Sequence, residues 1–162
     1  MSLSPKTARE SATEMVQLVL PNDTNPHGSV LGGTVMHWMD MAAAMAAHRH
    51  ARTPVVTASV DQITFEAPIR VGQVAILRSR LTHVGKSSME VTVQVESEDL
   101  NSGSRRHTST AYFTFVAIDG AGRPVPVPPL RLETDDEREE FRRAEDRRAR
   151  RLEMRAGGER AG

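Results

Sequence analysis

The sequence predicts an α+β fold in which one curved antiparallel β-sheet wraps around one long central helix. Two observations indicate this class: one short strand precedes a long apolar helix, and four strands joined by short connections follow the helix. Short connections favour antiparallel neighbours. With 162 residues, the chain is long enough to bury a hydrophobic core in one domain.

The first elements are a polar segment, a strand and a loop. Residues 1–11 are polar, and we expect them to be frayed. Residues 15–20 form a short apolar run that is typical of a strand. Residues 21–27 contain two prolines, two asparagines and an aspartate, which favour a loop.

Residues 33–52 are the strongest helix candidate in the folded part of the chain. Methionine, alanine and tryptophan side chains occupy nearly all faces of this helix, which predicts that it is buried. Arg49, His50 and Arg52 suit the negative pole at its end, and Pro54 terminates it.

After Pro54 the apolar residues recur with a period of two, which is typical of strands. Val56, Ala58 and Val60 lie on one face, but Phe65 is out of phase with them, which predicts a bulge near Asp61. A single small sheet would leave exposed edges and apolar surface, so we expect a dimer that joins two sheets. The strands are predicted at 55–65, 73–84, 89–96 and 106–118.

The C-terminal part is a proline-rich extended segment, 124–129, followed by a charged helix at 130–155. Residues 131–162 hold ten arginines and ten acids. These favour a solvated, partly disordered helix stabilised by i,i+4 pairs; the alternative is a helix that packs along a neighbouring subunit. The predicted organisation is a flexible N-terminus at 1–11, a folded domain at 12–130 and a charged helical tail at 131–162.

The composition excludes several classes of function. The chain has no cysteine, which rules out disulfides, thiolate zinc sites and cysteine nucleophiles. Its 21 basic and 21 acidic residues argue against nucleic acid or an anionic membrane as the main partner. No stretch approaches the roughly 20 apolar residues of a membrane span, and residues 1–10 do not resemble a secretory signal. We therefore expect a cytoplasmic protein.

A carboxylate and two glycines at the helix are the first candidate functional groups. Asp40 lies inside an otherwise apolar helix, where an ionised carboxylate is costly unless partnered; it is a functional residue or a capping or salt-bridging one. Gly32 and Gly33 begin the helix, where free amides and the helix dipole can stabilise an oxyanion. The alternative is a tight helix entry. Asn25, in the preceding loop, is by itself typical of a turn.

Two short polar segments are candidates for binding phosphate. Lys86, Ser87 and Ser88 follow Gly85 at a strand turn, and Arg105 with Arg106 begins a later strand. The alternatives are an ordinary hairpin turn and a solvated basic pair. The histidines show no metal-ligand spacing, and the sequence has neither a nucleophile-elbow motif nor a P-loop.

Two adjoining motifs resemble the loop–helix signature of hot-dog-fold acyl-CoA hydrolases. They are Asn-Pro-His-Gly-Ser-Val-Leu-Gly-Gly at 25–33 and Val-Met-His-Trp-Met-Asp at 35–40. This family includes cytosolic long-chain acyl-CoA hydrolases with two fused hot-dog domains and similar single-domain bacterial enzymes. The resemblance covers about residues 12–155 and continues at 55–61, 85–91, 111–116, 126–128 and 133–137.

The resemblance implies an acyl-CoA thioesterase of fatty acid metabolism that releases free fatty acid and CoA. It implies a functional pair, an Asn from one hot-dog domain and an Asp from its partner, and the matching residues are Asn25 and Asp40. Asp40 would be general base or nucleophile, and Asn25 would position the water or the carbonyl. It implies a homodimer with two composite sites, usually in a hexameric trimer of dimers, and no cofactor besides the CoA of the substrate. Pro26 after Asn25 is a minor departure.

Two other functions are compatible with the same fold. One is a hot-dog hydratase or dehydratase, which depends on a histidine acting with a carboxylate; His27 is the candidate, but the helix carries Asp40 without a matching histidine motif. The other is a non-catalytic acyl-CoA-binding protein. Such a sensor would normally carry a second module such as a helix-turn-helix, and the charged tail has the wrong composition for one.

Overall fold

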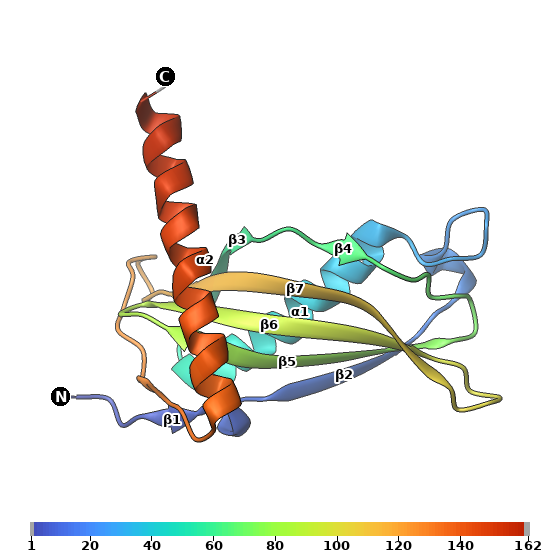
Figure 1. Ribbon diagram of the computed structural model, residues 1–162, viewed down its shortest axis with the longest axis horizontal. Coiled ribbons are helices and arrows are strands. Elements are labelled where there is room, and N and C mark those ends of the chain that lie inside the picture. Colours follow the sequence, from blue (N-terminus) through green and yellow to red (C-terminus); the bar gives the residue numbers. More distant parts are fainter. Residues whose placement is uncertain (1, 161–162) are drawn as a thin grey trace.

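The structure, a computed structural model, describes residues 2–160. Its main sheet has the strand order β2-β5-β6-β7-β3, with β4 paired to β7, and all of these pairs are antiparallel. Helix α1 lies against one face of the sheet and helix α2 crosses the other (Figure 1). The predicted α+β fold is therefore confirmed. The main elements are β2 (Thr13–Leu18), α1 (Gly32–Ala51), β3 (Val55–Val60), β4 (Thr64–Phe65), β5 (Val74–Val84), β6 (Ser88–Glu98), β7 (Arg105–Ala117) and α2 (Asp135–Arg160).

The hydrophobic core lies between α1 and the inner face of the sheet. Alternate residues of β6, such as Met89 and Val91, point inward and are fully buried, as the period of two predicts. Phe113 and Phe115 of β7 extend the same layer. The alanines that face them from α1 let the helix approach the strands closely, and the Ser79 hydroxyl of β5 donates a hydrogen bond of 2.7 Å to the Ala42 carbonyl.

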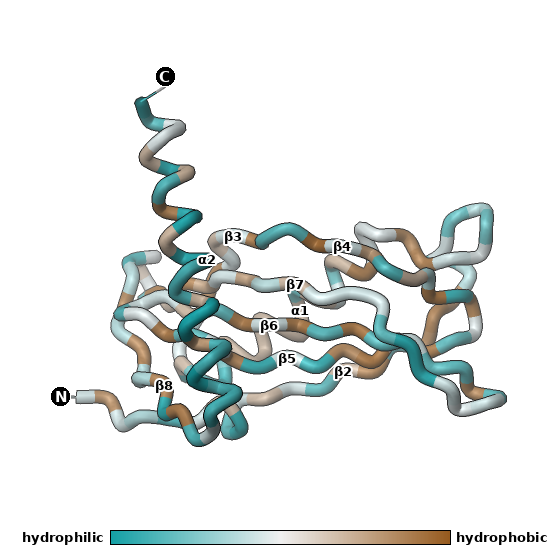
Figure 2. Tube along the Cα trace, viewed as in Figure 1, coloured by the Kyte–Doolittle hydropathy of each residue, from teal (hydrophilic) through white to brown (hydrophobic). Residues whose placement is uncertain are grey.

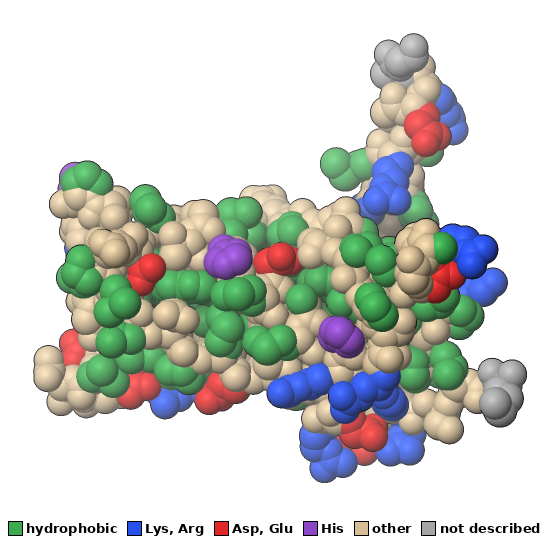
Figure 3. Space-filling model, turned by 180° about the vertical axis from the view of Figure 1, so that it is seen from behind, with side chains coloured by type: hydrophobic (Ala, Val, Ile, Leu, Met, Phe, Trp, Pro, Cys, Tyr) green, Lys and Arg blue, Asp and Glu red, His purple; other side chains and the backbone are tan. Residues whose placement is uncertain are grey.

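The expectation that α1 is buried on all sides is wrong for the single chain. The face that carries Trp38 and Met39 is buried, whereas Met36, Met41 and Met45 on other faces are 42%, 37% and 39% exposed. The sheet covers only one side of the helix, so an apolar pattern all round cannot all be buried by one protomer. Figure 3 shows hydrophobic side chains spread over this side of the molecule.

The predicted bulge lies three residues earlier than expected. The pairing of β3 with β7 shifts register between Thr57 and Ser59, so the bulge is at Ala58 and not at Asp61. The change of phase has a second cause: residues 61–63 separate β3 from β4. Pairing with β7 resumes at Thr64.

The N-terminal segment, expected to be frayed, is packed from residue 6 onward. Strand β1 (Lys6–Thr7) pairs in parallel with β8 (Leu130–Arg131), and a 3₁₀ turn at Ala8–Glu10 follows. Thr7, Ala8 and Ser11 are buried, and the Lys6 ammonium donates a 2.8 Å hydrogen bond to the His50 carbonyl. The polar composition concealed these contacts, because small side chains and backbone groups make most of them. The division of the chain into domain and tail stays a prediction.

Helix α2 is mostly hydrophilic, with isolated hydrophobic residues along it (Figure 2), and one of its faces packs on the sheet. Thr134 and Glu137 form reciprocal hydrogen bonds at its start, with the Glu137 amide donating to the Thr134 hydroxyl at 3.1 Å. Ala144 is buried, and the Phe141 ring lies 4.4 Å from the His83 ring of β5, centroid to centroid. The distal half then extends past β3 (Figure 1). None of the helices among residues 2–160 is long and apolar enough to cross a membrane.

Candidate active site

Asp40 lies near the middle of α1 and is bound by a hydroxyl group. The Thr57 hydroxyl of β3 donates a 2.8 Å hydrogen bond to Asp40 Oδ1. Among residues 2–160, Asp40 has no ion pair, so the salt-bridging alternative has no support here. Because Thr57 fixes one oxygen, the carboxylate is oriented while Oδ2 stays available to another group.

Asn25 organises the loop that precedes α1. Its side-chain oxygen accepts hydrogen bonds from the amides of His27 at 2.9 Å and Ser29 at 3.2 Å, and its carbonyl accepts one from the Gly28 amide at 3.0 Å. These contacts are those of an Asx turn. These hydrogen bonds use the side-chain oxygen of Asn25 and leave its NH₂ group as a donor. Asn25 therefore stabilises the turn and still has a donor group for a ligand.

The first turn of α1 presents unpaired backbone donors. Leu31 precedes the helix without a capping side chain, and its carbonyl accepts from the amides of Thr34 and Val35. Within the described part of the chain, no backbone acceptor pairs with the amides of Gly32 and Gly33. These two N–H groups lie at the positive end of the helix dipole and can therefore stabilise negative charge.

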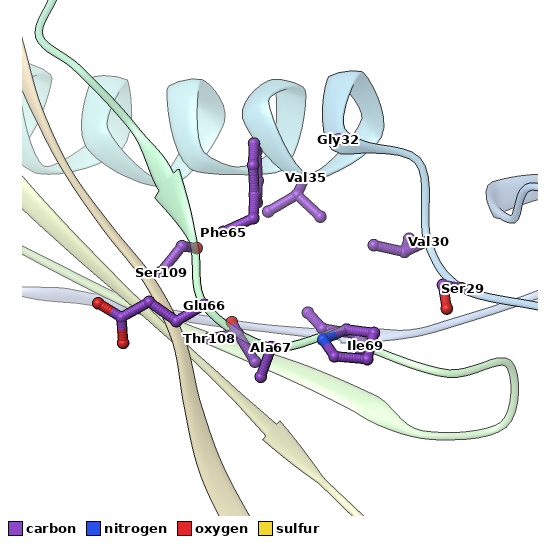
Figure 4. A pocket seen from close by; sticks show the side chains of 11 residues that line it. Ser29, Val30, Gly32, Val35, Phe65, Glu66, Ala67, Ile69, Thr108 and Ser109 are labelled. Carbon is purple, nitrogen blue, oxygen red and sulfur yellow. The ribbon is translucent and has the colours of Figure 1, made fainter.

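A cavity of about 370 Å³ opens beside this first turn, between α1 and β4. Figure 4 shows Val35 and Phe65 on the helix side and Ile69 opposite them, so its walls are largely apolar. The Ser109 hydroxyl at its edge is buried without a hydrogen-bond partner. A Cβ on Gly32 would lie 3.5 Å from the Phe65 ring, which is an ordinary van der Waals contact.

One protomer does not bring all the predicted catalytic groups to this cavity. Gly32 lines it, whereas Asn25, Gly33 and Asp40 do not. Asp40 is eight residues beyond Gly32, which is about 12 Å along the helix axis. The arrangement is that of two partial sites on one protomer, one at the helix start and one at Asp40.

The residues predicted to bind phosphate lie at opposite ends of the sheet. Ser87 and Ser88 are at the turn between β5 and β6, and Ser88 pairs with Val116, whereas Arg105 pairs with Glu98 at the far end of β6. The 11 residues of β6 span roughly 35 Å. Arg105 also forms a 3.2 Å ion pair with Glu98. Lys86, Ser87 and Ser88 therefore cannot share a phosphate with Arg105 and Arg106 within one protomer.

Thr57 is the site residue that sequence reasoning missed. It lies in the matched segment 55–61, but a threonine in a strand has no pattern that distinguishes it from its neighbours. Its contact with Asp40 joins residues 17 positions apart and depends on how β3 lies against α1. No group of three or more His, Asp or Glu side chains that could hold a metal ion is found among residues 2–160.

Comparisons with known proteins identify relatives that match most of this chain. Residues 27–104 match the model of the thioesterase superfamily. An uncharacterized acyl-CoA thioester hydrolase of Bacillus subtilis is 43% identical over 136 residues, which cover 83% of this chain and 79% of that protein. The cytosolic acyl coenzyme A thioester hydrolase of Rattus norvegicus is 40% identical over 94% of this chain, but the match spans only 40% of the length of the rat protein.

Solved structures agree with these relatives. An acyl-CoA hydrolase from Bacillus cereus superimposes with a TM-score of 0.91 at 38% identity, covering 98% of this chain and 96% of that chain. A hexameric acyl-CoA thioesterase gives 0.90 at 38% identity, with 95% and 99% covered. The sheet wrapped around α1 is the hot-dog fold of thioesterases. Within that class, the chain belongs to the acyl-CoA thioester hydrolase family, which includes single-domain bacterial members.

Proposed function

We propose that the protein is a thioesterase that hydrolyses fatty acyl-CoA to a free fatty acid and CoA. The observation that carries this proposal is Asp40, a carboxylate on an apolar helix that is oriented by the Thr57 hydroxyl and has no cation beside it among the described residues. An oriented carboxylate without a counter-charge is suited to accept a proton or to attack a carbonyl carbon. The name of the rat relative supports a cytoplasmic location.

A related enzyme supports the choice of residues. Structures of the Staphylococcus aureus acyl-CoA hydrolase include alanine variants of an aspartate, an asparagine and a threonine, and a complex with butyryl-CoA. The spacing of these three residues along that chain equals the spacing of Asn25, Asp40 and Thr57. We therefore assign the corresponding roles to these three residues here.

The catalytic unit in this proposal is a dimer. Helix α1, with its exposed methionines, packs beside the edge strand β3, on which Val56 and Val60 are 44% and 41% exposed. A second copy placed against β3 would cover both surfaces and remove the open sheet edge. It would also bring the Asn25 loop of one protomer to Asp40 of the other. Three such dimers would give the hexamer that is described for a relative.

In the proposed reaction, the acyl chain occupies the apolar cavity beside Gly32. The thioester oxygen receives hydrogen bonds from the amides of Gly32 and Gly33, which stabilise the charge that develops on it. Asp40 of the other protomer takes a proton from water as the water oxygen bonds to the carbonyl carbon. Alternatively, this Asp40 attacks the carbon itself and forms an anhydride that water then cleaves. The carbon–sulfur bond breaks, CoA leaves as its thiolate, and Asn25 orients the water or the carbonyl.

The test measures thiol release, with a chromogenic reagent, from acyl-CoAs of increasing chain length. Asp40→Asn should lower kcat by about 100-fold or more, because it removes the base but keeps the size and the hydrogen bond with Thr57. Asp146→Asn, on the exposed surface of α2, is the matched control and should retain parental activity. A fully active Asp40→Asn variant would overturn the mechanism. Acyl-CoA binding without thiol release would favour the non-catalytic binding protein instead.

A further inference from the structure

The charges of α2 are segregated along its length, although the chain as a whole is neutral. Residues 135–146 hold seven acids and three arginines, whereas residues 147–160 hold six arginines and two acids. The acidic half packs across the sheet through Phe141 and Ala144. The basic half begins over the sheet, where Arg147 contacts Glu90 of β6, and its remainder extends past β3 (Figure 1). Positive charge is therefore concentrated on the overhanging part of the helix.

Two cavities lie under this overhang, and we call them together the α2 cleft. One, of about 270 Å³, lies between α2 and the turn that carries Ser87 and Ser88. The other, of about 620 Å³, lies between α2 and the end of β3. Ser59, Arg151 and Arg155 line both cavities, so the two adjoin along the helix.

The α2 cleft has more positive than negative groups. Arg147, Arg148, Arg150, Arg151 and Arg155 line it, together with only two carboxylates, Glu90 and Asp61. Within residues 2–160, three of these arginines, Arg148, Arg150 and Arg155, form no ion pair.

The two carboxylates are already neutralised by the other two arginines. Glu90 is 2% exposed and accepts hydrogen bonds from Arg147 at 3.0 and 2.7 Å and from the Thr82 hydroxyl at 2.6 Å. Arg147 also stacks on the Tyr112 ring at 3.8 Å, and Arg151 donates a 3.0 Å hydrogen bond to Asp61. These contacts fix α2 on the sheet, and the remaining arginines of the cleft are exposed and available to an external anion.

The α2 cleft adjoins the candidate catalytic carboxylate through β3. Thr57, which binds Asp40, is followed directly by Ala58 and Ser59, and both of these line the cleft. Ser87 and Ser88 line the same cleft from the turn between β5 and β6. One of the two predicted phosphate-binding segments thus lies here, whereas Arg105 and Arg106 lie at the far end of the sheet.

We infer that the α2 cleft binds a ligand that carries two or more phosphate groups, through Arg148 and Arg155 with the hydroxyls of Ser87 and Ser88. Guanidinium groups form paired, charge-assisted hydrogen bonds with phosphate oxygens. The ligand is either the nucleotide end of acyl-CoA or a free nucleotide with the same phosphate chemistry. The first assignment rests on the proposed function. In either case, substrate recognition or control is located on α2, a helix outside the sheet-and-helix core.

The test compares two substrates, acyl-CoA and the matching acyl-pantetheine, which has no phosphate. Arg148→Ala/Arg155→Ala should raise KM for acyl-CoA at least tenfold and leave kcat unchanged, because the charge-assisted hydrogen bonds to the phosphates are lost while the reacting groups stay in place. KM for acyl-pantetheine should not change. Arg143→Ala/Arg160→Ala removes the same charge from α2 outside the cleft and is the matched control.

Binding of CoA and of ADP, measured by calorimetry, completes the test. Unchanged KM for acyl-CoA with weakened ADP binding would support the cleft and assign it to a free nucleotide. Equal KM increases for both substrates, or no change in KM and in both affinities, would overturn the inference. If the parent protein releases no thiol, the proposed function fails, and weakened CoA binding by the double variant would still support the cleft.

Discussion

At the scale of single residues, Asp40 and Asn25 show how one side chain can have a structural and a functional part. The Asn25 oxygen closes an Asx turn while its NH₂ group stays free, and one oxygen of Asp40 is held by Thr57 while the other stays available. Each side chain is therefore oriented through one bonded atom, and its other polar atom is free to bind a reacting group. This is the preorganisation that a reacting group needs.

The orientation of Asp40 predicts the behaviour of Thr57 variants. Thr57→Val keeps the β-branched shape but removes the 2.8 Å hydrogen bond to Asp40, so kcat for acyl-CoA should fall about tenfold while the free energy of unfolding changes little. Thr57→Ser retains the hydroxyl and should stay close to the parent in kcat. Parental kcat in Thr57→Val, or an equal loss in both variants, would show that this hydrogen bond does not orient the carboxylate.

The sequence was informative about single residues only where a motif or a chemical anomaly distinguished them. Asp40 is anomalous because it lies in an apolar helix, and the family motif identified Asn25 as its functional counterpart. Thr57 and Arg148 have no such signal, because their surroundings form only when β3 reaches α1 and α2 crosses the sheet. Long-range contacts of this kind have no local pattern.

At the scale of elements, the period of the apolar residues predicted the strands to within a few residues. The prediction of 73–84 compares with β5 at Val74–Val84, and 106–118 compares with β7 at Arg105–Ala117. The bulge was misplaced because two irregularities shift the alternation of apolar side chains between Val55 and Phe65. One is the bulge at Ala58, and the other is the break between β3 and β4 at 61–63. The charged helix was predicted at 130–155, but α2 spans Asp135–Arg160, because Leu130 and Arg131 form β8 and Thr134 with Glu137 caps the helix start.

Two buried histidines join elements and predict a dependence of stability on pH. His50 of α1 makes a 2.7 Å hydrogen bond with the Pro128 carbonyl, and His83 of β5 packs on Phe141 of α2. Burial lowers the pKa of both imidazoles below the ordinary value near 6.5. The unfolded chain therefore binds more protons than the folded one, so stability is constant above about pH 7 and falls as pH drops through 6.5.

The measurement is the urea midpoint of unfolding between pH 5 and pH 8. The parent should lose stability below about pH 6.5, and His83→Gln should lose less because one of the two buried imidazoles is gone. His48→Gln, which replaces an exposed histidine of α1, should follow the parental curve. A midpoint that does not change with pH would contradict the role of these two imidazoles.

At the scale of the whole molecule, totals conceal how groups are distributed. Equal numbers of acids and bases suggested no charged partner, yet the basic residues of α2 collect where the helix leaves the sheet. In the same way, an apolar helix suggested complete burial, yet three of its methionines remain exposed in one chain. Both features become intelligible only when the elements are placed in space, and both point to partners outside the protomer.

The composite site predicts that two inactive variants restore activity when they share a dimer. Asn25→Ala and Asp40→Asn each inactivate both sites of a homodimer, but a mixed dimer has one site with both parental residues. Random mixing after unfolding and refolding should recover about a quarter of parental kcat, since half of the dimers are mixed and each has one intact site of two. Mixing either variant with itself is the control. If Asn25 and Asp40 act within one protomer, no mixed dimer has an intact site, and the mixture should stay as inactive as its components.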